Sequence, residues 1–413
     1  MPLLRPQPGP PLSLTLSRDL VRTLKRGNPW VFADALRESP GELRAVPPGS
    51  HALLHDTRGK PLALGMYDPG PTLCFRACTV VGEGAAGGGG KDPAPRPLDD
   101  AWALARLEPA LALRRIWLGE DTTGWRLVNG EGDGLPGLVL DVYADTAVIR
   151  LDGDGPAGFY DARGIARWAA DALGLRAVVE RTRGEEGASA LVGAAPAEPV
   201  PFLENGAWFT ADLARGQKTG FFLDQRENRA LVRRLAAGRR ALNLFGYTGG
   251  FSVAAGLGGA AHVTTVDLAA PAVQAAGEHW SMNGLPHAAH EGVVADAFDY
   301  LDRSARAGRA WDLVIADPPS FAPNKAALPK ALAAYRRLVA AAAGVTAPGA
   351  LLAAASCSSH VDAPTFLTLC EEGIGTARRR ATVVAVHGQP MDHPTPLALP
   401  EFRYLKFVLL RVE

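Results

Sequence analysis

The sequence has few cysteines, no excess charge of either sign and no apolar segment at its N-terminus. Four cysteines in 413 residues are too few for a disulfide scaffold, and Cys74 and Cys78 are separated by three residues rather than the two of a zinc knuckle. The 43 Lys plus Arg balance 43 Asp plus Glu, which excludes a global positive field, so nucleic acid would need a local basic patch. Without a secretory signal, we expect a cytoplasmic protein, and we expect no metal site.

One uncharged segment, residues 338–359, is about long enough to span a bilayer. It contains Ala-Pro-Gly at 347–349, followed later by Ser-Cys-Ser-Ser. A helix that ends at a turn and a buried strand after it explain this pattern better than a membrane span. We therefore expect no contact with a membrane.

The length of 413 residues predicts about three folded domains. Residues 81–100 read as a linker, because four consecutive glycines and three prolines leave little to pack. Residues 1–80 contain short apolar runs between Gly and Pro turns, which predict a small β-rich domain. Residues 101–200 begin with helical periodicity and continue into strand-like runs, which indicates a mixed α/β central domain.

Residues 201–413 alternate apolar, strand-like runs with helical stretches. This rhythm predicts a Rossmann-like, doubly wound parallel sheet covered by helices on both faces. The expected strands are 241–245, 262–267, 292–296, 311–317, 350–355, 382–386 and 404–410. In such a sheet the ligand lies beyond the carboxyl ends of the strands, so the residues that follow each strand are the candidates for chemistry.

The first of these strands ends in a glycine-containing loop formed by Phe245, Gly246, Tyr247, Thr248 and Gly249. Its glycines let a ligand approach the backbone, although a simple tight turn is an equally good interpretation. The spacing is not G-x-G-x-x-G, which weakens a dinucleotide reading, and no Walker loop is present, which disfavours ATP.

Two acidic residues follow the next two strands. Asp267 comes about 20 residues after the glycine loop, where a carboxylate can accept hydrogen bonds from both ribose hydroxyls. Asp296 is placed to accept from an adenine amine, although a helix N-cap is a nearly equal alternative. Together the three strand ends describe an adenosine-bearing ligand.

The fourth and fifth strands end in an acid and a thiol. Asp317 is followed by Pro318 and Pro319, which make its loop rigid. Cys357 lies at the end of the fifth strand, at the same edge of the sheet. A surface turn and a buried filler cysteine are the structural alternatives, but the expected proximity of the two features favours a catalytic pair.

These motifs together resemble class I S-adenosylmethionine (SAM) methyltransferases. They most closely resemble the bacterial large-subunit (23S) ribosomal RNA cytosine-C5 methyltransferases that carry an N-terminal PUA domain. The resemblance covers nearly the whole chain, including 26–32, 130–137, 216–226, 392–394 and 404–407. It implies SAM as the cofactor, S-adenosylhomocysteine (SAH) as its product and ribosomal RNA, single-stranded or partly assembled, as the partner; a homodimer is compatible with it.

The resemblance also implies roles for particular residues. The catalytic pair is Cys357, which attacks cytosine C6, and Asp317, which binds the N3/N4 edge of the base, with His360 a candidate helper. The cofactor-binding residues expected are Phe245, Gly246, Tyr247, Thr248, Gly249, Asp267, Leu268, Asp296, Ala297, Asp317, Pro318 and Arg226. The substrate-binding residues expected are Lys218, Pro319, Phe321, Arg22, Lys25, Arg26 and Trp30, with Arg18 beside the last four.

Several alternatives stay open at this stage. Phe321 suits a core position as well as a base-stacking one, and Lys218 and Arg226 suit a solvated face. The wider RNA cytosine-C5 enzymes commonly carry a second cysteine where this chain has Pro319, so the base that removes the C5 proton is unassigned. Methylation of a base amine, which needs no thiol, and a non-catalytic RNA-binding assembly factor are the competing functions.

Overall fold

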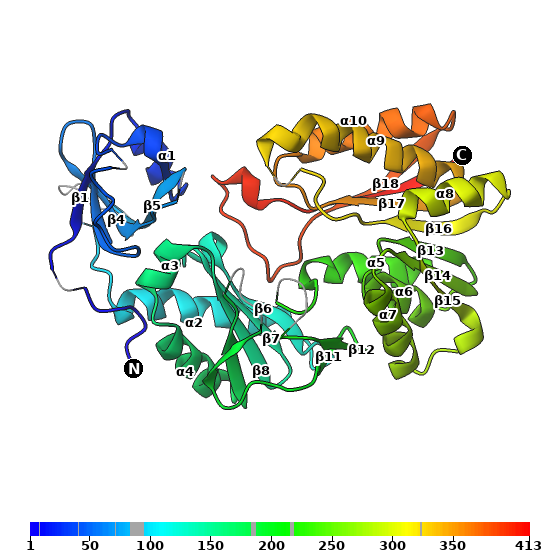
Figure 1. Ribbon diagram of the computed structural model, residues 1–413, viewed down its shortest axis with the longest axis horizontal. Helices are drawn as coiled ribbons and strands as arrows, with labels where there is room; N and C mark the ends of the chain where they lie inside the picture. Colours follow the sequence, from blue (N-terminus) through cyan, green and yellow to red (C-terminus); the bar gives the residue numbers. More distant parts are fainter. Residues whose placement is uncertain are drawn as a thin grey trace. The chain divides into compact units, whose positions relative to one another are not determined.

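The computed structural model describes residues 1–7, 9–39, 41–70, 72–82, 95–182, 187–214, 219–322 and 324–413. The chain forms two compact units (Figure 1). Unit 1 contains Met1–Phe202, Ala211–Phe221 and Met391–Pro400, and unit 2 contains Leu203–Thr210, Phe222–Pro390 and Glu401–Glu413. Most of the expected linker, residues 83–94, lies outside the described residues. In the part of the chain that is described, every helix is too short or too polar to cross a membrane.

The N-terminal part of unit 1 is a small β-rich domain, as its short apolar runs predict. Its five strands have the order β1-β3-β4-β5-β2. The elements are β1 (Leu12–Thr15), α1 (Val21–Lys25), β2 (Trp30–Phe32), η1 (Ala33–Ala35), β3 (His51–His55), β4 (Pro61–Tyr67) and β5 (Leu73–Val80). Residues of these strands are buried in one apolar core that includes Leu14, Leu54 and Phe75.

The rest of unit 1 is mainly a mixed α/β domain with the strand order β10-β9-β8-β7-β6. Its elements are α2 (Asp100–Trp117), β6 (Gly124–Asn129), η2 (Gly130–Asp133), β7 (Leu138–Tyr143), β8 (Thr146–Leu151), α3 (Asp154–Phe159), α4 (Ala162–Leu173), β9 (Ala177–Glu180) and β10 (Ser189–Val192). The side chain of Asp99 caps α2 and that of Asp161 caps α4. The hairpin of β11 (Val200–Glu204) and β12 (Ala207–Ala211) follows, and its residues Leu203–Thr210 belong to unit 2.

A buried ion network joins the β-rich and central domains within unit 1. Arg76 on β5 donates to Asp68 Oδ2 at 2.7 Å and to Glu131 Oε1 at 2.8 Å. The indole N–H of Trp30 donates to the same Glu131 oxygen at 2.8 Å. Because Glu131 belongs to the central domain, these contacts fix the β-rich domain against it.

Unit 2 is built on a seven-stranded sheet with the order β15-β14-β13-β16-β17-β19-β18. Its strands are β13 (Arg240–Leu244), β14 (His262–Asp267), β15 (His290–Val294), β16 (Trp311–Ala316), β17 (Thr346–Ser356), β18 (Ala381–His387) and β19 (Lys406–Val412). Its helices are η3 (Leu223–Gln225), α5 (Arg226–Leu235), α6 (Gly250–Leu257), α7 (Ala270–Met282), η4 (His287–Ala289), α8 (Ala297–Arg306), η5 (Lys325–Ala327), α9 (Leu328–Gly344), α10 (Ala363–Thr376) and η6 (Pro400–Phe402), the last at the border of the two units.

Both faces of this sheet are covered, as its apolar strands predict. On the central strand β16, Leu313 and Ile315 belong to the core shared with α5, α6 and α7. Val314 and Ala316 alternate with them and belong to the core shared with α8, α9 and α10 (Figure 1). The fold class expected from the sequence is therefore confirmed.

One strand of the sheet runs opposite to the expected direction. We predict an all-parallel sheet from the sequence, but β19 is antiparallel to both β17 and β18. An apolar run reads the same in either direction, and its direction depends on the long connection 388–405 that precedes it. The prediction of an all-parallel sheet is thus wrong for β19.

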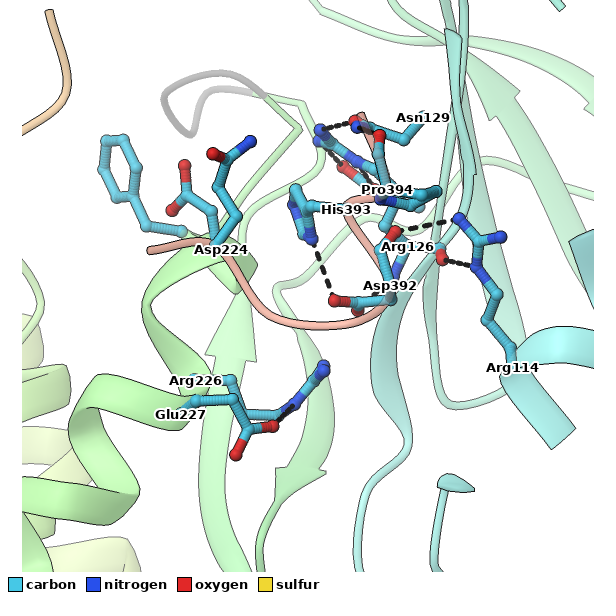
Figure 2. A network of polar contacts seen from close by, with 12 residues as sticks. Arg114, Arg126, Asn129, Asp224, Arg226, Glu227, Asp392, His393 and Pro394 are labelled. Carbon is cyan, nitrogen blue, oxygen red and sulfur yellow. Dashed lines mark hydrogen bonds and ion pairs between the residues drawn. The ribbon is translucent and has the colours of Figure 1, made fainter. Parts of the chain in front are cut away.

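Part of that connection, Met391–Pro400, leaves unit 2 and packs in unit 1. The backbone N–H of Arg126 donates to Asp392 Oδ2 at 3.0 Å, and Arg114 donates to the Asp392 carbonyl at 2.8 Å (Figure 2). Asn129 Nδ2 donates to the carbonyl of Pro394 at 2.8 Å. The sequence-based division assigned this segment to the domain formed by residues 201–413. Its long-range contacts make it part of unit 1 instead.

Candidate active site

The carboxyl ends of four parallel strands meet at one edge of the unit 2 sheet. Leu244 of β13 pairs with Val266 of β14 on one side and with Ala316 of β16 on the other, and Ala316 pairs with Ala354 of β17. The residues that follow these strands are therefore neighbours in space. They are the loop 245–249, Asp267, the Asp317 loop and Cys357.

The loop 245–249 has a strained backbone. Phe245 and Tyr247 have positive φ angles of 55° and 47°, which non-glycine residues rarely adopt. Gly249 has φ +80°, and a Cβ atom there would lie 2.7 Å from the Cβ of Ala276, so only glycine fits. Backbone strain of this kind is typical of ligand-binding loops, which favours a ligand site over a simple turn.

A buried histidine supports the same loop from behind. The backbone N–H of Thr210 donates to Nε2 of His279 at 3.0 Å, so Nε2 is the unprotonated ring nitrogen. Nδ1 then carries the proton and donates it to the carbonyl of Thr248 at 2.8 Å. Burial lowers the pKa of His279, which keeps the ring neutral and its hydrogen bonds in place.

Asp267 is held at the sheet edge by two backbone groups. Its Oδ2 accepts from the N–H of Tyr247 at 2.8 Å and its Oδ1 accepts from the N–H of Ala269 at 2.9 Å. The carboxylate is half-buried, and each oxygen keeps a second lone pair for a ligand hydroxyl. The neighbouring Leu268 is 72% exposed. This arrangement fits the ribose of an adenosine-bearing cofactor.

Asp296 is the N-cap of α8. Its Oδ1 accepts from the N–H groups of Phe298 and Asp299 at 2.9 and 3.1 Å. The capping alternative considered from the sequence therefore holds, and it involves one carboxylate oxygen. The side chain of Asp296 is exposed and the adjacent Ala297 is buried. The adenine-binding role of both residues stays a prediction.

Asp317 is oriented by a residue that we did not identify from the sequence. Gln225 Nε2 donates to Asp317 Oδ2 at 2.9 Å, and Asn228 Nδ2 donates to Gln225 Oε1 at 2.6 Å. Gln225 and Asn228 are both buried, so their contacts fix the Asp317 carboxylate. Gln225 could have been named as a candidate from the sequence, because it lies beside Arg226 in the 216–226 motif.

The thiol of Cys357 lies beside the Asp-Pro-Pro loop, as expected. Its Sγ atom is 4.0 Å from the carbonyl oxygen of Pro318, and the residue is half-buried. The other three cysteines are buried, and burial raises the pKa of Cys370 to about 12. Position and exposure therefore favour Cys357 as the candidate for a reactive thiol.

Ser358 ties the Cys357 loop to its surroundings. Its Oγ atom lies 2.9 Å from Ser320 Oγ and 2.8 Å from the hydroxyl of Tyr335 on α9. Phe321 packs against Tyr335 with ring centroids 4.8 Å apart and against Phe245 at 6.4 Å. Phe321 is thus part of the core face as well as of the loop, and base stacking stays a prediction.

The remaining predicted site residues lie in different surroundings. Arg226 is only 1% exposed and its Nε lies 3.3 Å from Glu227 Oε1 (Figure 2). Arg226 is therefore not on a solvated face, and its role toward the cofactor stays a prediction. Lys218 lies outside the described residues. Pro318 is buried and Pro319 is exposed.

The expected RNA-binding patch of the β-rich domain is only partly solvent-facing. Arg22 and Lys25 on α1, and Arg26 after it, are exposed. Arg18 pairs with Asp34 at 3.1 Å. Trp30 is half-buried at the junction with the central domain, as described above, so it has a structural role besides any role in RNA binding.

The ribose assignment predicts the effect of removing the Asp267 carboxylate. We expect Asp267→Ala to weaken SAM binding by about 10- to 100-fold, because hydrogen bonds to a charged acceptor contribute about 1.5–3 kcal/mol each. Titration calorimetry with SAM measures this effect. Asp302→Ala, at an exposed ion pair with Arg306, is the control and should bind SAM normally. Unchanged affinity of Asp267→Ala would refute the ribose assignment.

Comparisons with known proteins agree with this geometry. Residues 161–394 match the family described as S-adenosylmethionine-dependent methyltransferase, and residues 14–79 match a PUA-like domain. A ribosomal RNA large subunit methyltransferase from Deinococcus radiodurans is 37% identical over 420 residues, covering 98% of both chains. The ribosomal RNA large subunit methyltransferase I of Shewanella denitrificans is 33% identical, covering 95% of this chain and 97% of its own.

Solved structures share the fold. A protein from Streptococcus mutans described as a SAM-dependent methyltransferase superposes with a TM-score of 0.81 at 24% identity, covering 97% of this chain and 100% of its own. A methyltransferase in complex with SAH gives a TM-score of 0.82 at the same identity and coverage. The chain therefore belongs to the SAM-dependent methyltransferase family that includes these ribosomal RNA large subunit methyltransferases, with a PUA-like domain at its N-terminus and SAM as its cofactor.

Proposed function

We propose that the protein methylates carbon 5 of a cytosine in large-subunit ribosomal RNA, with Cys357 forming a transient covalent bond to the base. The observation that carries this proposal is the half-buried thiol 4.0 Å from the carbonyl of Pro318, at the sheet edge where Asp267 and the loop 245–249 also lie. The names and coverage of the relatives support ribosomal RNA as the substrate. Such a substrate supports the expected cytoplasmic location.

The cofactor site fits SAM on this chain's own residues. The strained loop 245–249 offers backbone close to the ligand, and the Asp267 carboxylate is oriented for a ribose diol. When bound, SAM supplies an electrophilic methyl group. Asp267, Leu268 and Asp296 would hold its adenosine part, and the Asp317 loop would close the side that faces the base.

Cytosine C5 is too weak a nucleophile to attack a sulfonium methyl group unaided. Addition of the Cys357 thiolate to C6 would move electron density onto C5, which would take the methyl group from the sulfonium sulfur and leave SAH. A base would then take the C5 proton, the electron pair of that C–H bond would form the C5–C6 double bond, and the Cys357 sulfur would leave with its bonding pair. Release of the N3 proton restores the neutral aromatic ring. Each turnover thus adds one methyl group to the base and returns the thiolate.

Asp317 would bind the N3/N4 edge of the base. Binding is tighter after the thiolate has added, when the ring takes up a proton at N3, so this contact stabilises the adduct more than the substrate. A base bound in this way must be turned out of its helix, which favours single-stranded or partly assembled RNA.

The exposed cations Arg22, Lys25 and Arg26 would hold the RNA through its phosphates. The identity of the modified nucleotide is tested by incubating the protein with labelled SAM and unmodified ribosomal RNA and mapping the product by mass spectrometry. We expect 5-methylcytosine. A methylated base amine would favour the amine mechanism, and RNA binding without label transfer would favour an assembly factor.

A further inference from the structure

Lys406 is a buried lysine on the strand that pairs with β17, whose last residue precedes Cys357. It is the first residue of β19 and pairs with Ser356 at the end of β17, one residue before the cysteine. Its Nζ donates to the carbonyl of Ser358 at 2.6 Å and to that of Tyr404 at 2.7 Å. The ammonium is therefore anchored to the residue that follows Cys357, with only 2% of Lys406 exposed.

The charge of Lys406 has no carboxylate within ion-pair distance among the described residues. Burying an ammonium group without a counter-charge is expensive, and burial lowers the pKa of Lys406 to about 8, with Cys357 and Asp362 opposing the shift. The exposed Asp362 is engaged at the N-terminus of α10, where its Oδ1 accepts from the N–H of Thr365 at 2.9 Å. Cys357, which is half-buried, and Asp362, which is exposed, are thus the two acidic groups that act on the ammonium.

Three other ionisable groups near Cys357, among the residues that the structure describes, supply no buried positive charge. On α9, Tyr335 is neutral, and burial raises the pKa of its hydroxyl. On the Asp-Pro-Pro loop, Asp317 is itself an acid and accepts from Gln225. On the same loop as the cysteine, His360 is exposed. Lys406 is therefore the buried positive charge that we expect to act on the Cys357 thiol.

We propose that Lys406 is a positioning residue that holds Cys357 as a thiolate through its charge. The thiol proton passes to solvent, the sulfur keeps the electron pair, and Lys406 is an ammonium below its lowered pKa of about 8. This inference rests on the proposed function, because only addition to a pyrimidine ring requires the thiolate. According to this proposal, the charge of Lys406, at the start of β19, keeps Cys357 ionised before RNA binds.

The test is the pH dependence of Cys357 alkylation by iodoacetamide, followed on its peptide by mass spectrometry. The alkylation midpoint of the folded protein should lie below that of the same protein in denaturant. The denatured midpoint should be ~8.5, the pKa of an unperturbed thiol. Lys406→Met should raise the midpoint by about one pH unit or more, because an opposite charge is lost. Lys406→Arg keeps the charge and should restore the lower midpoint.

Asp362→Asn is the matched control, because it removes the exposed acid that also acts on Lys406. Its alkylation midpoint should not rise, and melting curves should show that each variant is folded. Equal midpoints for the wild type and Lys406→Met would overturn the inference. If Lys406→Met fails to fold, the wild type alone provides the test. An alkylation midpoint of the folded wild type at or above that of the denatured protein would also overturn the inference.

Alkylation needs neither RNA nor SAM, so it separates this inference from the proposed function. With Lys406→Met we also expect the acid limb of the methylation rate to move to higher pH, so that activity lost at pH 7 partly returns at pH 9. A shifted alkylation midpoint together with full methylation by a Cys357→Ala variant would refute the cytosine-C5 mechanism and still support the electrostatic role of Lys406.

Discussion

Replacing Cys357 by alanine should abolish methyl transfer to RNA and leave SAM affinity unchanged. The reason is chemical, because without a sulfur at C6 the base cannot place enough electron density on C5. We expect a loss of at least about 10³-fold in rate, equivalent to about 4 kcal/mol of activation free energy. Single-turnover transfer of labelled methyl groups measures the rate, and calorimetry with SAM measures the affinity.

Cys370 on α10 provides the matched control for this substitution. It is also a thiol, but it is only 2% exposed in the core between the helices and the sheet. Cys370→Ala should therefore keep nearly full activity, with at most a modest loss of stability. Wild-type turnover by Cys357→Ala would contradict the covalent mechanism and favour methylation of a base amine, which needs no thiol.

Replacing Arg76 by methionine should cost about 3–5 kcal/mol of stability at the junction between the PUA-like and central domains. The change leaves the carboxylates of Asp68 and Glu131, which are 4% and 8% exposed, without their counter-charge. Hydrogen exchange of the β5 amides is the appropriate measurement, because it reports local opening in a chain of several domains.

The control for Arg76 is Arg150→Met, which removes a half-exposed arginine 3.6 Å from Asp152. Such a surface pair contributes little, so exchange should change by no more than about 0.5 kcal/mol. Equal protection of the β5 amides from hydrogen exchange in the wild type and in Arg76→Met would mean that the carboxylates of Asp68 and Glu131 do not depend on Arg76 for their stabilisation. Our account of the junction would then be wrong.

The sequence predicted most of the sheet because its strands are apolar runs at the right spacing. The strand at 262–267 was placed with the bounds that the structure has, and the loop after Leu244 and the acid at 267 follow from strand ends alone. The opposite direction of β19 was not predictable, because periodicity carries no information about direction. It depends on where a distant connection runs.

The parts of the site that we missed involve contacts between residues far apart in sequence. Gln225 reaches Asp317 across 92 positions, and Lys406 reaches Ser358 across 48. Lys406 also interrupts a run that reads as a buried strand, where a lysine suggests an exposed edge. In both cases the neighbour that gives the side chain its role is defined by the fold.

The excursion of Met391–Pro400 limits how this protein can be divided. The chain passes between its two units five times, at 202–203, 210–211, 221–222, 390–391 and 400–401. Ending the chain at Pro390 would remove β19, the strand between β17 and β18, together with Lys406. The catalytic half is therefore not a contiguous gene fragment, and its activity is best studied in the whole polypeptide.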